Sequence, residues 1–282
     1  MPNKVHVMSR PRATILNMAP YQTLAILPEL AFYVKSIEIQ KMDSNSFSSP
    51  LPHDVLPGLS VVMGFQYQAS LYRLENGEKK RLARCGVSGL QTQRRVFQPE
   101  NSNTKTILVK LYPWVTNALF KEDAYQFTNE AIALSEIVSQ SRISCLEEQL
   151  ASTTEVEELS LLVQGFLLDL LKVNKSKMPD NSIISFAQQL SRVDGVGSIA
   201  KLAQEYGLGT RSLERNFKSI IGMSPKKFLR LSQFQKTLFH LQSGAGWEEI
   251  VDCLNYYDQA HFINSFKDFS GITPGEFKVS NI

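Results

Sequence analysis

Two short sets of side chains, 49 residues apart, carry groups that match the edges of nucleic-acid bases. The first set is Thr210, Arg211, Ser212, Glu214 and Arg215, and the second is Gln259, Ala260, His261, Ile263 and Asn264. A guanidinium can donate in parallel to O6 and N7 of guanine, which makes Arg211 and Arg215 candidates for that base. The amides of Gln259 and Asn264 match adenine, and Ala260 or Ile263 can contact a thymine methyl group. Each arginine can equally bind a phosphate or lie on a solvated face. For His261, bracing the helix or binding a phosphate is the plainer alternative.

Both sets lie at the start of a pattern that the chain contains twice. Residues 213–228 and 262–277 share Phe, Lys, Gly, Pro and Phe at a constant offset of 49. Apolar residues at helical spacing predict a helix in each copy, which a glycine ends by adopting a left-handed conformation. In the first copy Gly222 takes that place, and Ser224 and Pro225 are suited to begin the next helix.

A shorter helix is expected before each copy, at residues 199–206 and 250–254. The connecting turns contain Gly207 and Asn255, residue types that accept a positive φ angle. A short helix, such a turn and a second helix with buried apolar residues form a helix-turn-helix motif. The chain therefore predicts two of these motifs in tandem, joined by a helix whose apolar stripe is Leu231, Phe234, Leu238 and Leu241.

These residues resemble a known family. The matching motifs are Leu202-Ala203-x3-Gly207, Leu213-x-Arg215-x-Phe217-Lys218-x3-Gly222-x2-Pro225 and Tyr257-Asp258-Gln259-Ala260-His261-Phe262-x3-Phe266-Lys267-x3-Gly271-x-Thr273-Pro274. Over about residues 182–280 they are similar to the DNA-binding domain of AraC/XylS transcription regulators. The resemblance implies a sequence-specific regulator whose two recognition helices enter successive major grooves of double-stranded DNA. It also implies that Lys218 joins the two sets in binding DNA, and that an activator of this kind would contact RNA polymerase.

The sequence departs from the family at a few positions. Gln233 and Thr237 stand where the family usually has Arg and Ala, and Asn264 stands where it often has Arg. Charge also divides the two motifs, because residues 198–242 contain eight Lys or Arg against two Glu, a formal charge of +6, whereas residues 243–282 carry −4. Neutralising phosphates supplies most non-specific affinity. The first motif is therefore expected to hold DNA and the second to add little beyond sequence choice.

Residues from about 20 to 115 have the pattern of short strands and turns. Several β-rich runs are bounded by Pro-Gly or Asn-Gly pairs, and Asn76-Gly77 is a hairpin signal. The prediction is a small antiparallel barrel or sandwich, resembling the cupin-like domains that precede such DNA-binding domains. The expected class is α+β with two domains, in which residues 1–174 form a sensor or dimerisation domain, 175–182 a linker and 183–282 the DNA-binding domain.

Helices are expected from about 122 to 172, the last of them with a wide apolar face. Its members are Val156, Leu159, Leu162, Val163, Phe166, Leu167 and Leu170. The face can pack on its own domain or form a homodimer seam over residues 154–172, and the sequence leaves both open. A barrel that binds a small-molecule effector and one filled by side chains also look alike from strand patterns.

Catalysis is not expected from the residue types present. Cupin enzymes hold a metal with clustered histidines, and this region offers only His53, so neither a metal nor another cofactor is predicted. Two other function classes stay open. One is an enzyme carrying this DNA-binding domain, such as a DNA-repair methyltransferase, which would need a reactive cysteine in a tight motif that Cys85 and Cys145 lack. The other is a protein-interaction module with a degenerate second motif.

The overall composition sets broad limits. The chain has 282 residues and is 43% hydrophobic, so it is large enough to bury the cores of two domains. Its formal charge of +3 is too small to indicate a class of partner. Three distant cysteines argue against a disulfide framework. The first twenty residues contain no apolar signal core, and the longest apolar run, residues 159–171, is too short to span a bilayer. A cytoplasmic location without a membrane partner is expected.

Overall fold

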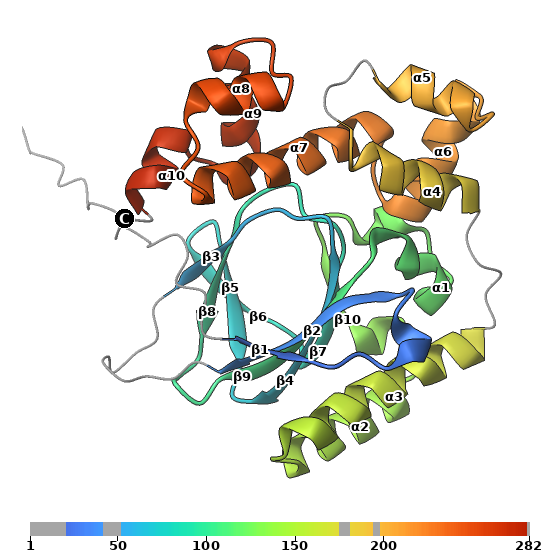
Figure 1. The fold of residues 1–282 in the computed structure, drawn as a ribbon. Coiled ribbons are helices and arrows are strands. Elements are labelled where there is room, and N and C mark those ends of the chain that lie inside the picture. The colour runs from blue at the N-terminus through green and yellow to red at the C-terminus, as the bar shows by residue number, and fades with distance from the viewer. Residues whose placement is uncertain (1–20, 42–51, 175–180, 194–197, 281–282) are drawn as a thin grey trace, which may run out of the picture.

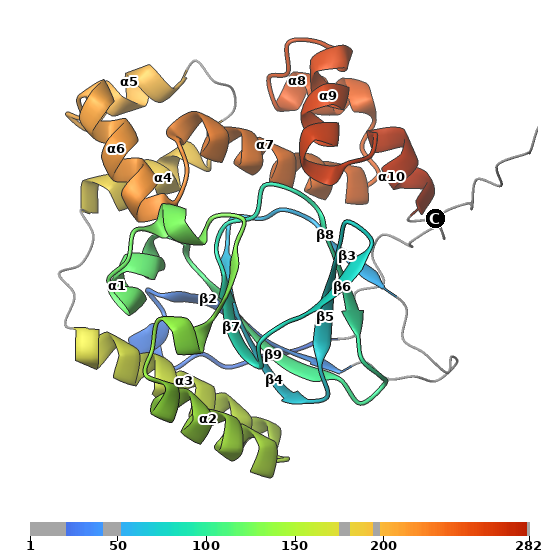
Figure 2. The ribbon, with the colours of Figure 1, turned by 180° about the vertical axis from the view of Figure 1, so that it is seen from behind.

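The computed structural model describes residues 21–41, 52–174, 181–193 and 198–280. Figure 1 shows a β-rich N-terminal region, residues 21–174, below a helical region, residues 181–280, and Figure 2 shows the same arrangement from behind. Most of the expected linker, residues 175–180, lies outside the described residues. Within the described ranges, no helix combines the length and apolar character needed to cross a bilayer.

The N-terminal region contains two antiparallel sheets that face each other (Figure 1). Its strands are β1 (Tyr21–Leu24), β2 (Val34–Lys41), β3 (His53–Val55), β4 (Val61–Gln68), β5 (Leu71–Glu75), β6 (Glu78–Arg81), β7 (Cys85–Ser88), β8 (Arg95–Pro99), β9 (Lys105–Leu111) and β10 (Ala131–Ala133). One sheet has the order β1-β2-β9-β4-β7-β10 and the other β3-β8-β5-β6, and the two do not join into a closed barrel. The α+β class is confirmed. The predicted hairpin joins β5 to β6, with positive φ angles of 51° at Asn76 and 85° at Gly77.

The larger sheet buries one face over its four middle strands. Strand register aligns two apolar rows across β2, β9, β4 and β7, namely Ile37–Val109–Met63–Val87 and Ile39–Ile107–Phe65–Cys85. The alternating Val and Ile pattern of these strands produces the rows, because side chains two apart share a face. Helices α2 (Gln140–Ser152) and α3 (Val156–Asn174) cover this face, and the ring centroids of Phe65 and Phe166 are 6.3 Å apart (Figure 1).

The segment before α2 differs from the expected helix. After η2 (Pro113–Val115), it contains only the short α1 (Thr116–Phe120), the single 3-10 turns η3 (Ala124–Phe127) and η4 (Leu134–Glu136), and β10. A 3-10 turn, η1 (Pro28–Leu30), also precedes β2. A continuous helix is broken at Asn129, whose φ angle is +65°, and β10 pairs with the edge of β7 instead. Helix α3 packs on its own region, since Leu159, Val163 and Leu167 are at most 1% exposed.

The helical region is organised along one long helix. Its elements are α4 (Asn181–Leu190), α5 (Ser198–Glu205), α6 (Thr210–Ile221), α7 (Pro225–Gln242), α8 (Trp247–Cys253), α9 (Gln259–Ser270) and α10 (Pro274–Ser280). Helices α4, α5 and α6 lie at one end of α7, and α8, α9 and α10 lie at the other (Figures 1 and 2). The predicted helix ends are confirmed, because Gly222 and Gly271 have φ angles of 101° and 75°, and the Ser224 hydroxyl accepts a hydrogen bond from the Lys227 amide.

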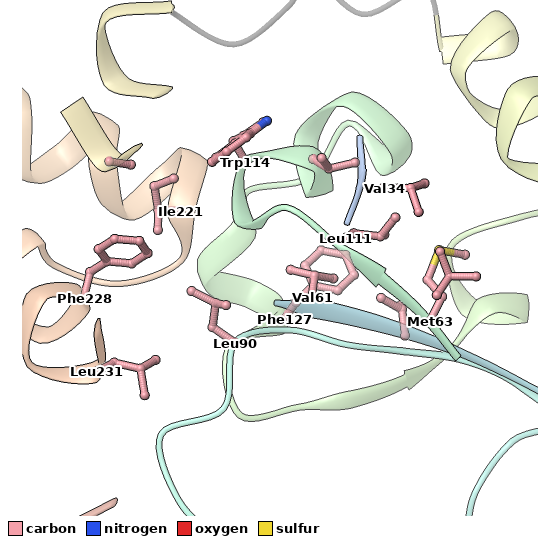
Figure 3. Packing of buried hydrophobic residues seen from close by; sticks show 14 of the residues in the cluster. Val34, Val61, Met63, Leu90, Leu111, Trp114, Phe127, Ile221, Phe228 and Leu231 are labelled. Atoms are coloured by element: carbon pink, nitrogen blue, oxygen red, sulfur yellow. The ribbon is translucent and has the colours of Figure 1, made fainter. Parts of the chain in front are cut away.

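The two regions share a continuous apolar contact, which Figure 3 shows at close range. Leu90, Phe127 and Trp114 of the N-terminal region lie beside Ile221, Phe228 and Leu231 of α6 and α7, and all six are buried. Burial of these six apolar side chains favours the packed arrangement of the two regions, because it removes their surface from water. Nothing in the sequence pattern indicated this contact, since its residues come from loops and helix ends far apart in the chain.

Candidate nucleic-acid interface

The first helix-turn-helix consists of α5 and α6, joined by a turn at Gly207, whose φ angle is +64°. Leu213, Phe217 and Ile221 lie on one face of α6 and are at most 2% exposed. The Phe217 ring packs edge to face between Phe186 and Phe228, at centroid distances of 5.8 and 5.4 Å. Because this face is occupied by the core, the opposite face of α6 is available to a partner.

That opposite face carries the predicted set. Thr210, Arg211, Ser212, Glu214 and Arg215 are all exposed in the first half of α6. With Gly209, four of these five line a shallow depression at the start of the helix, Glu214 being outside it. Among the described residues, neither Arg211 nor Arg215 forms an ion pair within the chain. Their guanidinium groups are therefore available to an external acceptor.

The second helix-turn-helix repeats this geometry with α8 and α9. Its turn contains Asn255, with a φ angle of +52°, and Asp258 caps α9 by accepting a 2.7 Å hydrogen bond from the His261 amide. Phe262, Phe266 and Phe269 face the core and are at most 4% exposed. Gln259, Ala260, His261 and Asn264 are exposed, whereas Ile263 is half-buried against the core. The structure thus brings four members of the second predicted set onto one exposed face.

The comparisons with known proteins agree with this arrangement. A family model described as a helix-turn-helix domain matches residues 202–279, and a domain of unknown function (DUF6597) matches residues 23–133. An uncharacterized HTH-type transcriptional regulator from Haemophilus influenzae is 29% identical over 122 residues, which are 43% of this chain and 39% of that protein. Residues 202–279 of the helical region are therefore a helix-turn-helix domain.

Two solved structures are similar to the chain at a lower level of sequence identity. ToxT from Vibrio cholerae, crystallised with a methylnaphthalenyl butenoic acid, has 11% identity and a TM-score of 0.48, covering 93% of this chain and 99% of ToxT. The AraC-like transcriptional activator CuxR has 15% identity and a TM-score of 0.27, covering 74% of this chain and 78% of CuxR. Because both TM-scores lie below 0.5, neither structure determines what this chain binds.

His261 has a bracing role in this structure. Its Nδ1 atom accepts a hydrogen bond from the Tyr257 amide at 3.3 Å, and its ring packs edge to face on Tyr256 at 5.5 Å. With its amide bonded to Asp258, the residue ties the turn to the first turn of α9. The other ring nitrogen, Nε2, is then the atom that a phosphate or base would meet.

Lys218 is separated from the other predicted residues. It lies in the second half of α6, and its Nζ atom is 5.2 Å from the centroid of the Tyr125 ring in the N-terminal region. A cation above an aromatic face is attracted to it. The structure therefore gives Lys218 an intramolecular partner. Arg211 and Arg215, in contrast, form no ion pair with any of the described residues.

Two residues that the sequence reasoning treated only as departures from the family connect α7 to the second motif. The Gln233 amide donates a 2.6 Å hydrogen bond to the Leu254 carbonyl, and the Thr237 hydroxyl lies 2.9 Å from the Tyr256 hydroxyl. Both side chains are buried, and burial raises the pKa of Tyr256. The position of the turn before α9 is thus fixed by polar contacts, a role that spacing alone could not indicate.

The N-terminal region offers little metal chemistry within the described ranges. No group of three or more His, Cys, Asp or Glu side chains there is placed to hold a metal ion. Burial lowers the pKa of His53, whose ring lies beside Phe97 at 6.1 Å. Arg73 is unusual, because its side chain is 9% exposed and its Nε and Nη1 atoms have no hydrogen-bond partner among the described residues, while Nη2 lies 2.5 Å from Glu75.

Proposed function

We propose that this chain is a sequence-specific DNA-binding transcriptional regulator that places α6 and α9 in successive major grooves of duplex DNA. The observation that carries the proposal is the duplicated motif, in which the first halves of both recognition helices are exposed while their other faces are buried. In a helix-turn-helix protein, the N-terminal residues of the second helix contact base edges. The exposed residues of α6 and α9 are the ones in that position.

The connection between the two motifs has a suitable length. Helix α7 has 18 residues, which at ~1.5 Å per residue span about 27 Å. Successive major grooves on one side of the duplex are about 34 Å apart. Two motifs that extend beyond the ends of such a helix can reach both grooves without bending it.

Each side chain has a role under this proposal. Arg211 and Arg215 bind guanine or phosphate, and Gln259 and Asn264 bind adenine. Thr210, Ser212, Glu214, Ala260 and His261 complete the two contact surfaces, with Ile263 contributing only the exposed part of its side chain. Lys226 and Lys227, both exposed in the first turn of α7, add positive charge close to the first motif.

The N-terminal region completes the proposed regulator. We infer that residues 1–174 form a sensor or dimerisation domain, joined through residues 175–182 to the DNA-binding domain at 183–282. A small-molecule effector with an acidic group would satisfy the unpaired nitrogens of Arg73. A homodimer would use the surface that α3 leaves exposed, where Leu161 is 57% exposed in a groove between α2 and α3. Contact with RNA polymerase would follow if the regulator is an activator.

Selection from a randomised duplex library tests the DNA-binding proposal. The full-length chain should enrich two short motifs whose centres are about one helical turn apart, ~10 base pairs. A variant with Arg211→Ala and Arg215→Ala should lose the motif that α6 contacts. Failure of the wild-type chain to enrich any motif at low salt would rule out sequence-specific binding and favour the protein-interaction alternative.

A further inference from the structure

Two loops of the N-terminal region, residues 89–95 and 123–130, are fastened together beneath the DNA-binding domain. The Gly89 amide donates to the Phe127 carbonyl at 3.2 Å, and the Asn129 amide donates to the Leu90 carbonyl at 3.0 Å. The Asn129 Oδ1 atom accepts from both the amide and the hydroxyl of Thr92, at 2.8 and 3.1 Å. We call this pair of loops the saddle.

The saddle is tightly built. A Cβ atom added to Gly89 would lie 2.2 Å from the Phe127 carbonyl oxygen, so the two backbones approach too closely for any other residue. Asn129 has a φ angle of +65°, a conformation that Asn and Gly adopt more readily than other residues. Arg95 also donates from its guanidinium to the Asn129 carbonyl. Asn129 is therefore the residue through which most of the bonds between the two loops pass.

One loop of the saddle holds the first recognition helix by its C-terminal end. The Thr128 hydroxyl donates to the Gly222 carbonyl at 2.8 Å, and the Ser219 hydroxyl donates to the Asp123 carboxylate. The ammonium of Lys218 lies above the Tyr125 ring. All these contacts are in the last turn of α6 or just after it, away from the exposed residues at its start.

The other loop holds the second recognition helix at the matching end. The Arg94 amide donates to the Phe269 carbonyl at 3.1 Å, in the last turn of α9. The Arg94 guanidinium lies 3.5 Å from the Asp54 carboxylate, whose side chain is fully buried. Close by along the chain, the Pro57 carbonyl accepts a hydrogen bond from the Gln235 side chain of α7. The saddle and the neighbouring residues Asp54 and Pro57 together contact α6, α7 and α9.

The apolar contact in Figure 3 fills the space between these polar attachments. Leu90 comes from one loop of the saddle and Phe127 from the other, and both belong to the apolar cluster that includes Phe228 and Leu231 of α7. Helix α7 already packs on both motifs, through Phe228 on Phe217 and through Phe234 on Phe269. Attachment at the C-terminal ends of both recognition helices adds a second constraint on the distance between them.

We propose that the saddle is a positioning element that fixes the separation of the two recognition helices, and that Asn129 is its key positioning residue. The proposal rests on the proposed function, since it assigns the spacing between the two DNA motifs jointly to α7 and to a loop pair outside the DNA-binding domain. Weakening the saddle should relax the spacing that the protein accepts while leaving each motif's own base preference unchanged. Any change in the N-terminal region that moves the saddle would reach both helices together.

The first test measures the separation directly and needs no DNA. Spin labels are attached through Glu205→Cys in α5 and Glu249→Cys in α8, both exposed, with the exposed Cys145 and Cys253 replaced by Ser. Pulsed electron resonance on the full chain should give one narrow distance distribution. Asn129→Ala, which loses both bonds to Thr92, should broaden that distribution at least twofold.

Matched variants separate positioning from general damage. Asn129→Asp keeps the acceptor oxygen and should retain the narrow distribution, whereas Asn129→Gly relieves backbone strain without restoring the bonds and should stay broad. If Asn129→Ala does not fold, Thr128→Val decides, because it removes only the half-buried hydroxyl that donates to Gly222. Unchanged distributions in Asn129→Ala, or in Thr128→Val as its substitute, would overturn the proposal, as would equal broadening in Asn129→Asp.

The second test uses the randomised duplex library. Wild-type protein should enrich its two motifs at one spacing, and Asn129→Ala should enrich the same two motifs at several spacings. Retention of the single wild-type spacing by a folded Asn129→Ala protein would contradict the positioning role. If the wild-type chain enriches no motif, the proposed function fails, and the distance measurement alone then decides whether the saddle fixes the helices.

Discussion

The difference in charge between the two recognition helices leads to a quantitative prediction. Arg211 and Arg215 are exposed on α6 in a segment of charge +6, whereas Gln259 and Asn264 are exposed on α9 in a segment of charge −4. Replacing both arginines by Ala should weaken binding to a selected duplex by about 2 kcal/mol or more, if each forms a base contact worth about 1–3 kcal/mol. That is a loss of roughly 30-fold or greater.

The salt dependence of binding distinguishes the two roles open to the arginines. Each lost phosphate contact should make the slope of log K against log salt shallower by about 0.9, so two such contacts give a change of about 1.8. Base contacts should instead reduce affinity for the selected duplex more than for a scrambled one. Fluorescence anisotropy between about 50 and 200 mM salt measures both quantities.

The matched control is the double variant with Gln259→Ala and Asn264→Ala. These side chains are neutral, so the salt slope should stay at its wild-type value and the loss of affinity should be smaller. All four positions are exposed, and each change should alter the free energy of unfolding by no more than about 0.5 kcal/mol, which a thermal melt checks. Equal affinity losses and equal slopes in the two double variants would refute the reasoning from charge.

Three further predictions concern stability and thiol reactivity. Gly271→Ala should lower the free energy of unfolding by about 1–2 kcal/mol, because the φ angle at this position is +75°. No further loss is expected, since no atom of the described residues beyond its chain neighbours lies within 4 Å of the added methyl group. Gly222→Ala should lower the free energy of unfolding, measured with denaturant, by at least about 1 kcal/mol more than Gly271→Ala, because its methyl group would lie 2.6 Å from the Thr128 hydroxyl of the saddle. Equal losses in the two variants would argue against close packing of α6 on the saddle. Arg73→Met should stabilise the chain by about 1–3 kcal/mol, since it removes two buried donors that have no partner in the described part of the chain, and a loss of stability would indicate that the cation is satisfied. Burial raises the pKa of the Cys85 thiol to about 12, so this thiol should react with a thiol reagent at pH 8 only after unfolding, while the two exposed thiols react in the native chain.

The helical region could be predicted closely because its signals are local. Gly222 and Gly271 end helices, Ser224 caps one, and Thr273 and Glu276 form a reciprocal cap, with a 2.7 Å bond from the Thr273 amide to Glu276. Each of these features depends on residues within four positions of one another, so spacing alone specifies them. Because the pattern repeats at an offset of 49 residues, each feature predicted in one motif also predicts the matching feature in the other.

The N-terminal region could be predicted only in class. Strand existence follows from β-rich runs, but the order β1-β2-β9-β4-β7-β10 depends on pairings between distant segments. The prediction of a helix at the three-residue β10 was wrong. The sequence Ala-Ile-Ala has no strong preference for a strand, and its extended conformation depends on pairing with β7. The half of the saddle that follows Phe127 was missed for the same reason. Its conformation at Asn129 is fixed by a loop more than thirty residues earlier in the chain.

The matching glycines of the two motifs show how the duplicated units have different surroundings. Gly222 lies against the saddle, with the Ala124 carbonyl oxygen 3.0 Å from where a methyl group would be, whereas the space around Gly271 is open. The first motif is thus packed against the N-terminal region through side chains and apolar surface, and it also carries the positive charge. The second is joined to the saddle by the backbone bond from Arg94 and to α7 through Gln233 and Thr237. A duplex should therefore be held mainly by α6, whose position is fixed, while the contribution of α9 depends on how well the saddle and α7 together set its distance. The affinity that the second motif adds should accordingly be more sensitive to changes in the saddle than the affinity that the first motif supplies.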